Sequence, residues 1–337
     1  MWGDVLLSID SSEVHTLLTM QSCIEAMRKA LAELASGKAV QELRSVVPIE
    51  EGKLLGQMPG FLKHSEILGT KVITIFQNNH EKGLPSHQGV VLLFDSKDGS
   101  LKAAVDGNAI TAIRTAAVSA VATDLLARKN AQTLCVLGSG EQARSHIEAM
   151  VLVRQIKLIK VWSRRREKAE RLKAEMEKAF NISIQVCDTA EEAAADAEII
   201  CTVTASKEPV LLGEWVAKGV HVNAVGACKA SDRELDSELV KQSEFFVDRR
   251  ESAVHESGDY LIPLMEGVID ESHIAGEIGD LLVGKLRGRS SEELITVFES
   301  LGLAIEDLAA ANFVYEEAVK RDLNRGGEND QQNGRII

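Results

Sequence analysis

Two patterns of apolar and polar positions divide the chain. Between residues 40 and 106, short apolar runs follow one another with turn residues between them. These runs cover residues 46–49, 53–58, 70–76, 90–95 and 101–105. The Asp98-Gly99 pair between the last two runs is a strong hairpin signal. Because no helical pattern separates these runs, they predict an antiparallel or mixed sheet.

From residue 132 onward, apolar runs alternate with helical segments. The runs cover residues 134–137, 157–162, 182–187, 198–203, 220–225 and 245–248, with helices expected between them, among others at 190–196 and 213–217. Alternation at this spacing predicts an α/β fold with a parallel, doubly wound sheet. A helix at 108–128 is expected to join the two regions. Residues 252–320 are expected to be mainly helical, with the last helix at 304–321.

The first turn of the second region has the sequence of a dinucleotide-binding loop. The apolar run at 134–137 leads into Gly138-Ser139-Gly140-Glu141-Gln142-Ala143, and an amphipathic helical pattern follows. Gly138 allows a sharp turn, Gly140 lets the backbone approach a pyrophosphate, and Ala143 is small enough for close packing of helix on strand. Free N–H groups at the helix N-terminus would face the phosphates. The predicted cradle consists of Gly138, Gly140, Glu141 and Gln142.

The residues after the second strand of this region indicate which nucleotide binds. NAD-binding chains usually have Asp or Glu there, whereas this chain has Ser163-Arg164-Arg165-Arg166. A carboxylate would repel a 2′-phosphate, while a hydroxyl and guanidinium groups would hydrogen-bond it. We therefore expect NADP(H) rather than NAD(H), with Ser163, Arg164 and Arg165 as ligands. Arg166 already lies in a run of alternating charge typical of an exposed helix.

Composition narrows the class of protein. A chain of 337 residues with 45% hydrophobic and 26% charged residues is long enough for two globular domains. The net charge of −13 argues against nucleic-acid binding. The sequence suggests no membrane span and no secretory signal, which predicts a cytoplasmic protein without a membrane partner. Five scattered cysteines without metal-ligand spacing predict reduced thiols and no metal site.

Three cations, Arg44, Lys71 and Arg114, occur in otherwise apolar or small-residue segments. A buried cation without a partner is strongly unfavourable, so each is expected to be paired, at the surface or facing a ligand. For any one of them, an internal ion pair is the simpler interpretation. Three of them beside a nucleotide-binding region favour an anionic substrate such as a carboxylate.

Three loops contain further polar candidates. His87 leads into a strand and could orient a cofactor or substrate, although a lone loop histidine is more often a structural hydrogen-bonder. Cys228 follows the run that ends at Val225, and ligands of open α/β sheets bind beyond the carboxyl ends of strands. Asp259 could add a carboxylate near this edge, or residues 257–259 could only cap the next helix.

These segments together resemble the ornithine cyclodeaminase/mu-crystallin family over residues 5–320. The motifs occur in order through both regions of the chain. They are LRSVVPI with Arg44, TKVITIF with Lys71, LPSHQGVVLLFD with Ser86 and His87, DGNAITAIRTAAVSAVAT with Arg114 and Thr115, VLGSGEQA, HVNAVGA, ESGD and VFESLGLAIEDL.

The resemblance implies homodimers in which a strand-rich domain supplies the dimer contact and the substrate pocket, while an inserted Rossmann domain holds the nucleotide. The corresponding expectation is a substrate and dimerisation domain at 1–112 plus 304–325, a Rossmann domain at 113–303 and a disordered tail at 326–337. The catalytic and substrate residues implied are Arg44, Lys71 and Arg114, with Cys228 at the substrate. The further cofactor contacts implied are Ser86, His87, Arg114, Thr115, Val225 and Cys228.

Two positions favour one activity within the family. Cyclodeaminases resemble this chain near Gly226 but carry a catalytic aspartate two residues beyond it, where this chain has Cys228, and they tend to be acidic at the ribose position. At both positions, this chain is more similar to the mu-crystallin branch of the family. This implies NADPH-dependent reduction of cyclic ketimine carboxylates such as Δ1-pyrroline-2-carboxylate or Δ1-piperideine-2-carboxylate. The alternatives are an amino-acid dehydrogenase, a cyclodeaminase or, in another class, an NADP-dependent carrier of a thyroid-hormone-like carboxylate.

Overall fold

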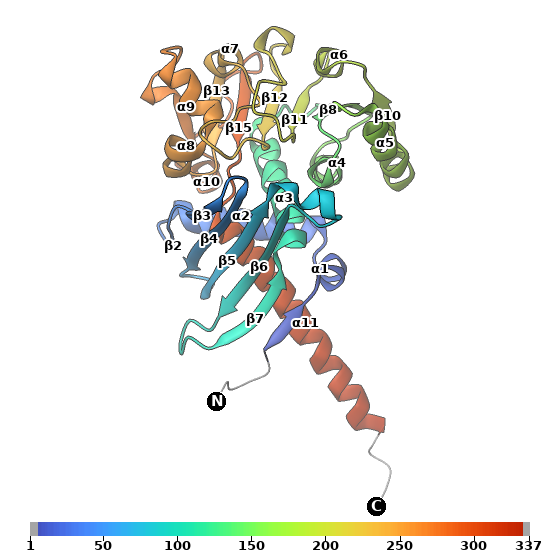
Figure 1. Cartoon of the computed structure of the whole chain (residues 1–337), viewed down its shortest axis with the longest axis vertical. Coiled ribbons are helices and arrows are strands. Elements are labelled where there is room, and N and C mark those ends of the chain that lie inside the picture. Colours follow the sequence, from blue (N-terminus) through green and yellow to red (C-terminus); the bar gives the residue numbers. More distant parts are fainter. Residues whose placement is uncertain (1–5, 333–337) are drawn as a thin grey trace, which may run out of the picture. The chain divides into compact units, whose positions relative to one another are not determined.

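The computed structural model describes residues 6–332, with side chains at all of these positions except 80–81 and 322–332. The chain forms two compact units (Figure 1). Unit 1 comprises residues 1–26, 37–111 and 304–337, and unit 2 comprises residues 27–36 and 112–303. Residues 27–36 were expected in the first domain. They belong to unit 2, where Arg28 forms an ion pair with Asp124 at 2.6 Å.

Unit 1 is built on a mixed sheet with the strand order β1-β7-β6-β5-β4-β2, and β3 pairs with β4 beside this path. β1 runs parallel to β7, and the other pairs are antiparallel. Gly99, with φ of +77°, forms the predicted turn between β6 and β7. The elements are β1 (Leu7–Ile9), α1 (Ser11–Leu17), the start of α2 (Met20–Ala35), β2 (Ala39–Gln41), β3 (Ser45–Glu50), β4 (Lys53–Leu62), β5 (Ile67–Phe76), η1 (Gln77–Lys82), β6 (His87–Phe94), β7 (Leu101–Asp106) and α11 (Ala304–Gln332).

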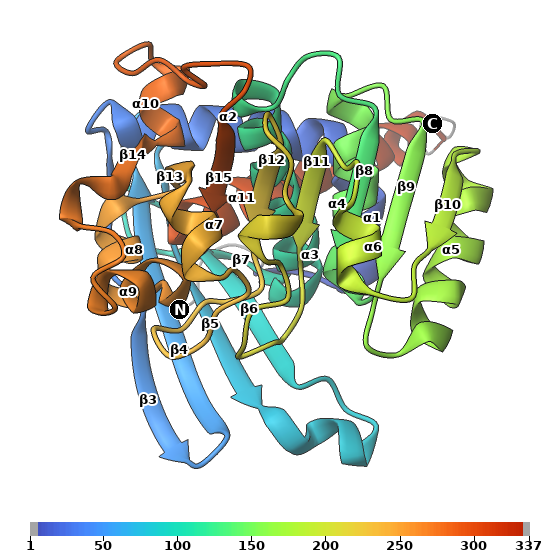
Figure 2. The same ribbon diagram turned by 90° about the horizontal axis from the view of Figure 1, so that it is seen from above.

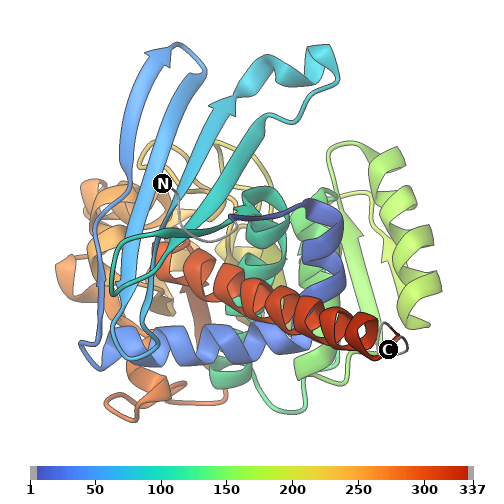
Figure 3. The same cartoon turned by 90° about the horizontal axis from the view of Figure 1, so that it is seen from below.

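Helix α11 packs across one face of this sheet because two glycines leave room for it (Figure 3). Gly60 and Gly69 are cross-strand partners on β4 and β5. A methyl group on Gly69 would lie 2.7 Å from Cδ2 of Leu308, and one on Gly60 would lie 3.2 Å from its Cδ1. The missing side chains therefore bring the first turns of α11 against β4 and β5.

Unit 2 is a parallel sheet with the order β10-β9-β8-β11-β12-β15-β13-β14, and Figure 2 shows these strands next to one another in this order. The order reverses between β8 and β11, so the topological switch point lies at their carboxyl ends. The first elements are α3 (Gly107–Leu126), β8 (Thr133–Leu137), α4 (Glu141–Val153), β9 (Leu158–Trp162), α5 (Arg166–Phe180), β10 (Ser183–Val186), α6 (Ala190–Ala194), β11 (Ile199–Thr202), η2 (Gly213–Trp215) and β12 (His221–Ala224). The remaining ones are α7 (Ser237–Lys241), β13 (Ser243–Val247), α8 (Arg250–Glu256), α9 (Gly258–Met265), η3 (Glu271–His273), β14 (Ile274–Glu277), α10 (Ile278–Leu282) and β15 (Ile295–Glu299).

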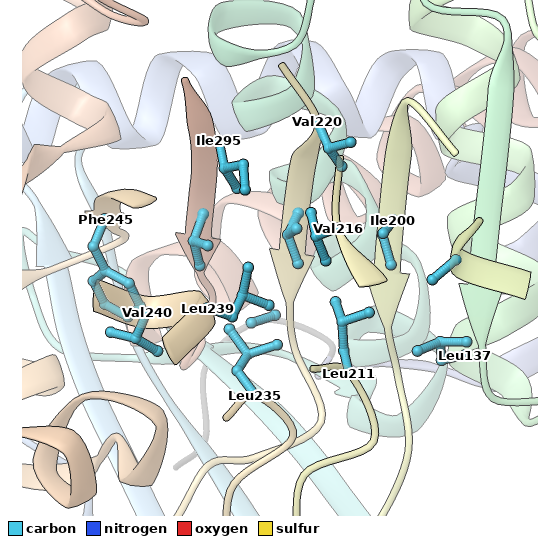
Figure 4. Packing of buried hydrophobic residues seen from close by; sticks show 14 of the residues in the cluster. Leu137, Ile200, Leu211, Val216, Val220, Leu235, Leu239, Val240, Phe245 and Ile295 are labelled. Atoms are coloured by element: carbon cyan, nitrogen blue, oxygen red, sulfur yellow. The ribbon is translucent and has the colours of Figure 1, made fainter. Parts of the chain in front are cut away.

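Alternating residues of these strands fill two different layers of core. Leu137, Ile200 and Ile295 belong to one buried apolar cluster, which also contains Leu239 and Val240 of α7 (Figure 4). On the other face, Asn223 of β12 donates a hydrogen bond to Thr123 of α3 at 2.9 Å. Both faces of the sheet are therefore covered by helices, as the doubly wound prediction requires.

Three sequence expectations about local structure were wrong. The region 252–320 contains β14 and the central strand β15, which pairs with β12 and β13; its short apolar run does not differ by periodicity from the start of a helix. The helix expected at 213–217 is a short 3₁₀ turn, η2. Helix α11 continues to Gln332, past residue 326 where disorder was predicted, because extending a formed helix costs much less than starting one. Residues 333–337 of that tail lie outside the described residues.

The sequence predicted no membrane span. Helix α3, however, is long and apolar enough to cross a membrane by length and composition. Of its most apolar 18-residue window, 83% is buried inside the protein. Packing within the protein is thus sufficient to explain its composition.

Candidate functional site

The loop after β8 has the geometry that its glycines predicted. Gly138 adopts a φ of +136°, and a methyl group there would lie 2.7 Å from the carbonyl oxygen of Val203, just after β11. Gly138 N–H donates to Trp162 O of β9 at 2.8 Å. The glycine therefore allows the loop to turn tightly at the switch point between β8 and β11.

The start of α4 fits a nucleotide pyrophosphate. Gly140 is the N-cap residue, no side chain caps the helix, and no heavy atom lies within 4 Å of where a methyl group on Gly140 would be. The N-terminus of α4 thus presents backbone N–H groups at an open approach, which suits a phosphate. Glu141 is exposed, Gln142 is half-buried and Ala143 is fully buried against the strand.

The residues after β9 divide into two groups. Ser163 Oγ lies 2.8 Å from Ser139 Oγ, so a hydroxyl pair joins this position to the glycine loop. Arg164 and Arg165 are exposed, and Arg165 is the N-cap residue of α5. Arg166 instead forms ion pairs with Asp188 and Glu170. Arg166 is therefore part of an exposed ion-paired helix start, as its alternating charge pattern predicted, whereas Arg164 and Arg165 are exposed just after β9.

The loop that carries Cys228 begins at the carboxyl end of β12. Val225 is buried, and its N–H donates to Thr202 O at 3.1 Å. Cys228 is half-buried, with its thiol 3.6 Å from Val225 O. Glu234, fully buried, accepts hydrogen bonds from Gly226 N and Thr204 N, both at 2.7 Å. This carboxylate fastens the loops after β11 and β12 to each other.

Two further buried carboxyl groups lie behind this loop. Asp259 Oδ1 accepts from the N–H groups of Glu234 (3.0 Å) and Leu235 (2.7 Å), and Glu299 Oε1 accepts from Ser257 Oγ at 2.5 Å. Burial, with Glu234 nearby, raises the pKa of Asp259 to about 8. Burial and the Asp259 charge raise the pKa of Glu299 well above its usual range. Asp259 therefore retains its proton at neutral pH.

The two sequence interpretations of residues 257–259 are separated by this geometry. Ser257 is the N-cap residue of α9 and accepts from Tyr260 N at 3.1 Å, so the capping interpretation is confirmed for the serine. Asp259 does not cap. Its carboxylate holds the backbone of residues 234 and 235 and thus supports the Cys228 loop.

Arg114 and Thr115 lie on the part of α3 that belongs to unit 2. Their exposed fractions are 4% and 7%, so both side chains are in the interior. A guanidinium group buried to this degree needs compensating contacts or a ligand. One neighbour of Arg114 is the turn at Gly302, which follows β15.

In unit 1, Lys71 forms a buried ion pair. Its Nζ lies 2.6 Å from Asp307 Oδ2 of α11 and 3.5 Å from Thr111 Oγ1, and the side chains of Lys71 and Asp307 are 4% and 0% exposed. Lys71 lies two residues after Gly69 on β5, so both face α11. The close approach of α11 at Gly69 therefore brings Asp307 within reach of the ammonium group.

Register relates Arg44 to Lys71. Arg44 is half-buried and immediately precedes β3, whose first residue, Ser45, pairs with Gln57. Continuing that register would set Arg44 opposite Met58, and Met58 pairs with Lys71. The two cations thus come from positions two strands apart, about 10 Å between backbones.

Ser86 and His87 lie together at the start of β6. Ser86 Oγ is 2.9 Å from His87 Nδ1, and Asn108 Nδ2 donates to His87 O at 3.0 Å. His87 is exposed and pairs with Ile75, four residues beyond Lys71 on β5. Its side chain faces the same side of the sheet as Lys71, but about 14 Å along the strand.

Sequence reasoning overlooked several residues of these sites, above all Asp307 and Asp248. Asp307 is fully buried, and Asp248 is 1% exposed at the end of β13. A signal existed for Asp307, because Glu306-Asp307 interrupts the apolar segment LGLAIEDLAAA. Acidic residues in a first helical turn are ordinarily explained by the helix dipole, which concealed it. Among the residues whose side chains the structure describes, no group of three or more His, Cys, Asp or Glu could hold a metal ion.

Known proteins are similar to this chain over nearly its whole length. Ketimine reductase mu-crystallin from Rattus norvegicus is 41% identical over 314 residues, covering 92% of this chain and 96% of that protein. The structure of Thermococcus litoralis Δ1-pyrroline-2-carboxylate reductase in complex with NADH and L-proline is 39% identical with a TM-score of 0.92, covering 94% of this chain and 98% of that one. An archaeal alanine dehydrogenase dimer with bound NAD is 33% identical with a TM-score of 0.90, covering 94% and 97%.

The sequence profile of one family also matches residues 6–322. That match spans both units, as the motifs do. The chain therefore belongs to the ornithine cyclodeaminase/mu-crystallin family.

Proposed function

We propose that this protein is an oxidoreductase that reduces the C=N bond of cyclic imino acids of the Δ1-pyrroline-2-carboxylate or Δ1-piperideine-2-carboxylate type with a pyridine nucleotide. The observation that carries this proposal is the similarity, over more than nine-tenths of the chain, to proteins named ketimine reductase and Δ1-pyrroline-2-carboxylate reductase. The open N-terminus of α4 and the glycine turn at the switch point support the nucleotide.

The nucleotide, when bound, supplies the hydride for the imine carbon. The side chains of the protein bind the substrate and assist its protonation. Arg114 binds the substrate carboxylate, and Arg44 offers a second cation for it, by the family resemblance. Lys71, as the ammonium ion, gives the imine nitrogen its proton, so that the protonated imine accepts hydride at carbon, and the neutral lysine takes a proton back from water between turnovers. Asp307 balances the ammonium charge and fixes its position.

We further propose that NADPH is preferred to NADH. Arg164 and Arg165 are exposed beside the end of β9, and the Ser139–Ser163 hydroxyl pair lies between them and the glycine loop. A 2′-phosphate would accept hydrogen bonds from these groups. The Thermococcus litoralis relative was solved with NADH, so the NADPH preference proposed for this chain is tested separately.

A homodimer is the proposed assembly, and the cytoplasm the proposed location. Strand β3 is exposed along its whole length and displays Val46, Val47 and Ile49, with 46%, 54% and 57% of their surfaces exposed. An apolar strand of this kind is suited to bury itself against a second chain. The archaeal relative is a dimer. All five cysteines are free thiols, which suits a reducing compartment.

The decisive experiment follows NADPH oxidation by absorbance with Δ1-piperideine-2-carboxylate and Δ1-pyrroline-2-carboxylate, and repeats it with NADH. We expect turnover with a preference for NADPH, faster at mildly acidic pH because a protonated imine accepts hydride more readily. Arg164→Ala with Arg165→Ala should remove the preference, whereas Arg166→Ala, which breaks only the pairs with Asp188 and Glu170, should retain it. Tight NADPH binding without turnover of either imine would refute the substrate assignment.

One alternative has an observation in its favour, the similarity to an archaeal alanine dehydrogenase. It predicts NAD(P)H oxidation with pyruvate and ammonia and none with cyclic imines. Ammonia release from ornithine with catalytic NAD would instead indicate a cyclodeaminase. Saturable binding of a thyroid-hormone-like carboxylate without any nucleotide oxidation would indicate a carrier.

A further inference from the structure

The turn after β15 has an unusual relation to Arg114. Gly302 has a φ of +79°, a conformation that residues with a side chain rarely adopt. A methyl group at Gly302 would lie 2.7 Å from Nη1, 2.8 Å from Nη2 and 3.1 Å from Cζ of Arg114. Both Nη atoms are nearer to that position than Cζ, so the terminal edge of the guanidinium group points at the backbone of Gly302. A side chain there would strain the backbone and displace the end of Arg114.

Asp248 holds this turn in place from the adjacent strand end. Its Oδ2 accepts hydrogen bonds from Leu301 N at 2.7 Å and Gly302 N at 2.8 Å, and its Oδ1 accepts from Arg249 N at 2.7 Å. β13 and β15 are parallel neighbours, with Val247 opposite Glu299, so Asp248 and the turn leave the sheet side by side. Hydrogen bonds to a buried carboxylate are stronger than those between neutral groups.

We propose that Asp248 and Gly302 are positioning residues for Arg114: the carboxylate fixes the turn, and the bare α-carbon of the glycine forms the surface against which the guanidinium group is oriented. This inference rests on the proposed role of Arg114 in binding the substrate carboxylate. A bidentate contact needs the donor edge of the guanidinium group in a defined direction, and a terminal edge held against a fixed backbone retains that direction. A side chain at residue 302 would move the end of Arg114 without touching the nucleotide loop.

The main test compares Gly302→Ala with Gly267→Ala. Gly267 has a similar φ of +70° but no heavy atom within 4 Å of the added methyl group, so this control reproduces the backbone strain without the collision. For Gly302→Ala we expect the KM for Δ1-piperideine-2-carboxylate to rise at least tenfold while the Kd for NADPH, from its fluorescence, changes less than threefold. Gly267→Ala should leave both constants near wild type. An unchanged KM in Gly302→Ala would overturn the inference.

A second measurement distinguishes a positioning role of Gly302 from a general loss of structure. If Gly302 acts through Arg114, adding Gly302→Ala to an Arg114→Ala variant should change kcat/KM less than twofold, because the group to be positioned is already gone. An equal loss in both backgrounds would mean a purely structural role. Asp248→Asn, which retains the shape but loses the charge, should raise the KM in the same direction as Gly302→Ala and by a smaller factor.

Binding of L-proline in the presence of NADP⁺, measured by calorimetry, distinguishes failure of this inference from failure of the proposed function. Weaker binding to Gly302→Ala than to wild type supports the positioning role without relying on turnover. Equal binding to both proteins refutes it and leaves the proposed function standing. A wild-type protein that neither binds L-proline nor reduces a cyclic imine refutes both.

Discussion

Lys71 in unit 1 and Arg114 in unit 2 are both buried cations, but the structure holds them in different ways. The ammonium group of Lys71 contacts a carboxylate directly, Asp307 at 2.6 Å. The guanidinium group of Arg114 lies against the backbone at Gly302, and Asp248 fixes that backbone through two N–H groups. The contact described for Lys71 balances its charge, whereas the contact described for Arg114 controls orientation.

The difference corresponds to the shapes of the two groups. An ammonium is a compact point charge that can rotate about its stem, so an opposite charge is the most effective restraint. A guanidinium is planar and donates from its edges, so a fixed backbone against its terminal edge restrains the direction of its other donor edge. Charge balance and orientation are therefore separate requirements, and variants can test each of them.

The largest effect on stability is expected from breaking the direct pair. Asp307→Ala leaves the Lys71 ammonium buried with its charge uncompensated, which should lower the free energy of unfolding by about 3–5 kcal/mol. Urea unfolding followed by circular dichroism measures this. Asp95→Ala is the control, because its pair with Lys102 at 3.5 Å is partly exposed and should contribute below about 1 kcal/mol. Equal losses in the two variants would contradict the assignment of Lys71 and Asp307 as a buried pair.

The stability of unit 2 should depend on pH because of Asp259, one of the two buried acids behind the Cys228 loop. The folded state keeps Asp259 protonated up to a pKa of about 8, well above its usual value of 3.8. Stability from this group is fully present below pH 3.8 and is lost as pH rises through 8. Burial lowers the pKa of His146 to about 4 and of His221 to about 3, and these groups destabilise only below pH 6.5. The window from pH 6.5 to 8 is therefore free of the histidines.

Across that window, the free energy of unfolding should fall by about 1–2 kcal/mol as pH rises. Asp259→Asn, which cannot titrate, should make the fall shallower by removing the contribution of Asp259, while His146→Gln should leave the dependence in place. Urea titrations at pH 6.5, 7.25 and 8 give the slopes. A free energy of unfolding that rises or stays level in the wild type would show that Asp259 does not retain its proton.

Arg114→Lys separates orientation from charge with a smaller effect. Lysine keeps the positive charge but cannot present a planar fork to a carboxylate or place two nitrogen atoms against Gly302. We expect kcat/KM for the imino acid to fall about tenfold, which is about 1.4 kcal/mol, chiefly through KM. Steady-state kinetics with fixed NADPH measures it. Wild-type kinetics in this variant would mean that charge alone is sufficient at residue 114.

The smallest change in stability is expected when the whole buried pair is replaced. Lys71→Met with Asp307→Leu removes both charges and fills similar space, so the unfolding free energy should stay within about 1 kcal/mol of wild type. Turnover of the imino acid should nevertheless disappear, because the proposed donor to the imine nitrogen is gone. Retained turnover in this stable double variant would exclude Lys71 from the chemistry.

Much of this protein could be predicted from local sequence patterns. The glycine turn after β8 is predicted because Gly138 and Gly140 sit between an apolar run and an amphipathic helix, and only a few backbone geometries satisfy that order. The mixed sheet of unit 1 follows from successive strands and the Asp98-Gly99 turn. Lys71 and Arg114 could be singled out because charges within apolar segments need a reason.

The groups that Lys71 and Arg114 contact are determined only by the tertiary structure. Lys71 and Asp307 are 236 positions apart in the chain, and their contact depends on the two glycines that bring α11 against β4 and β5. β15 is a short apolar run whose place between β12 and β13 is set by pairing with distant strands. The Gly302 turn supports Arg114 only because β15 ends beside β13 and Asp248. Local patterns determine periodicity and turn chemistry, whereas contacts between distant segments depend on how the whole chain packs.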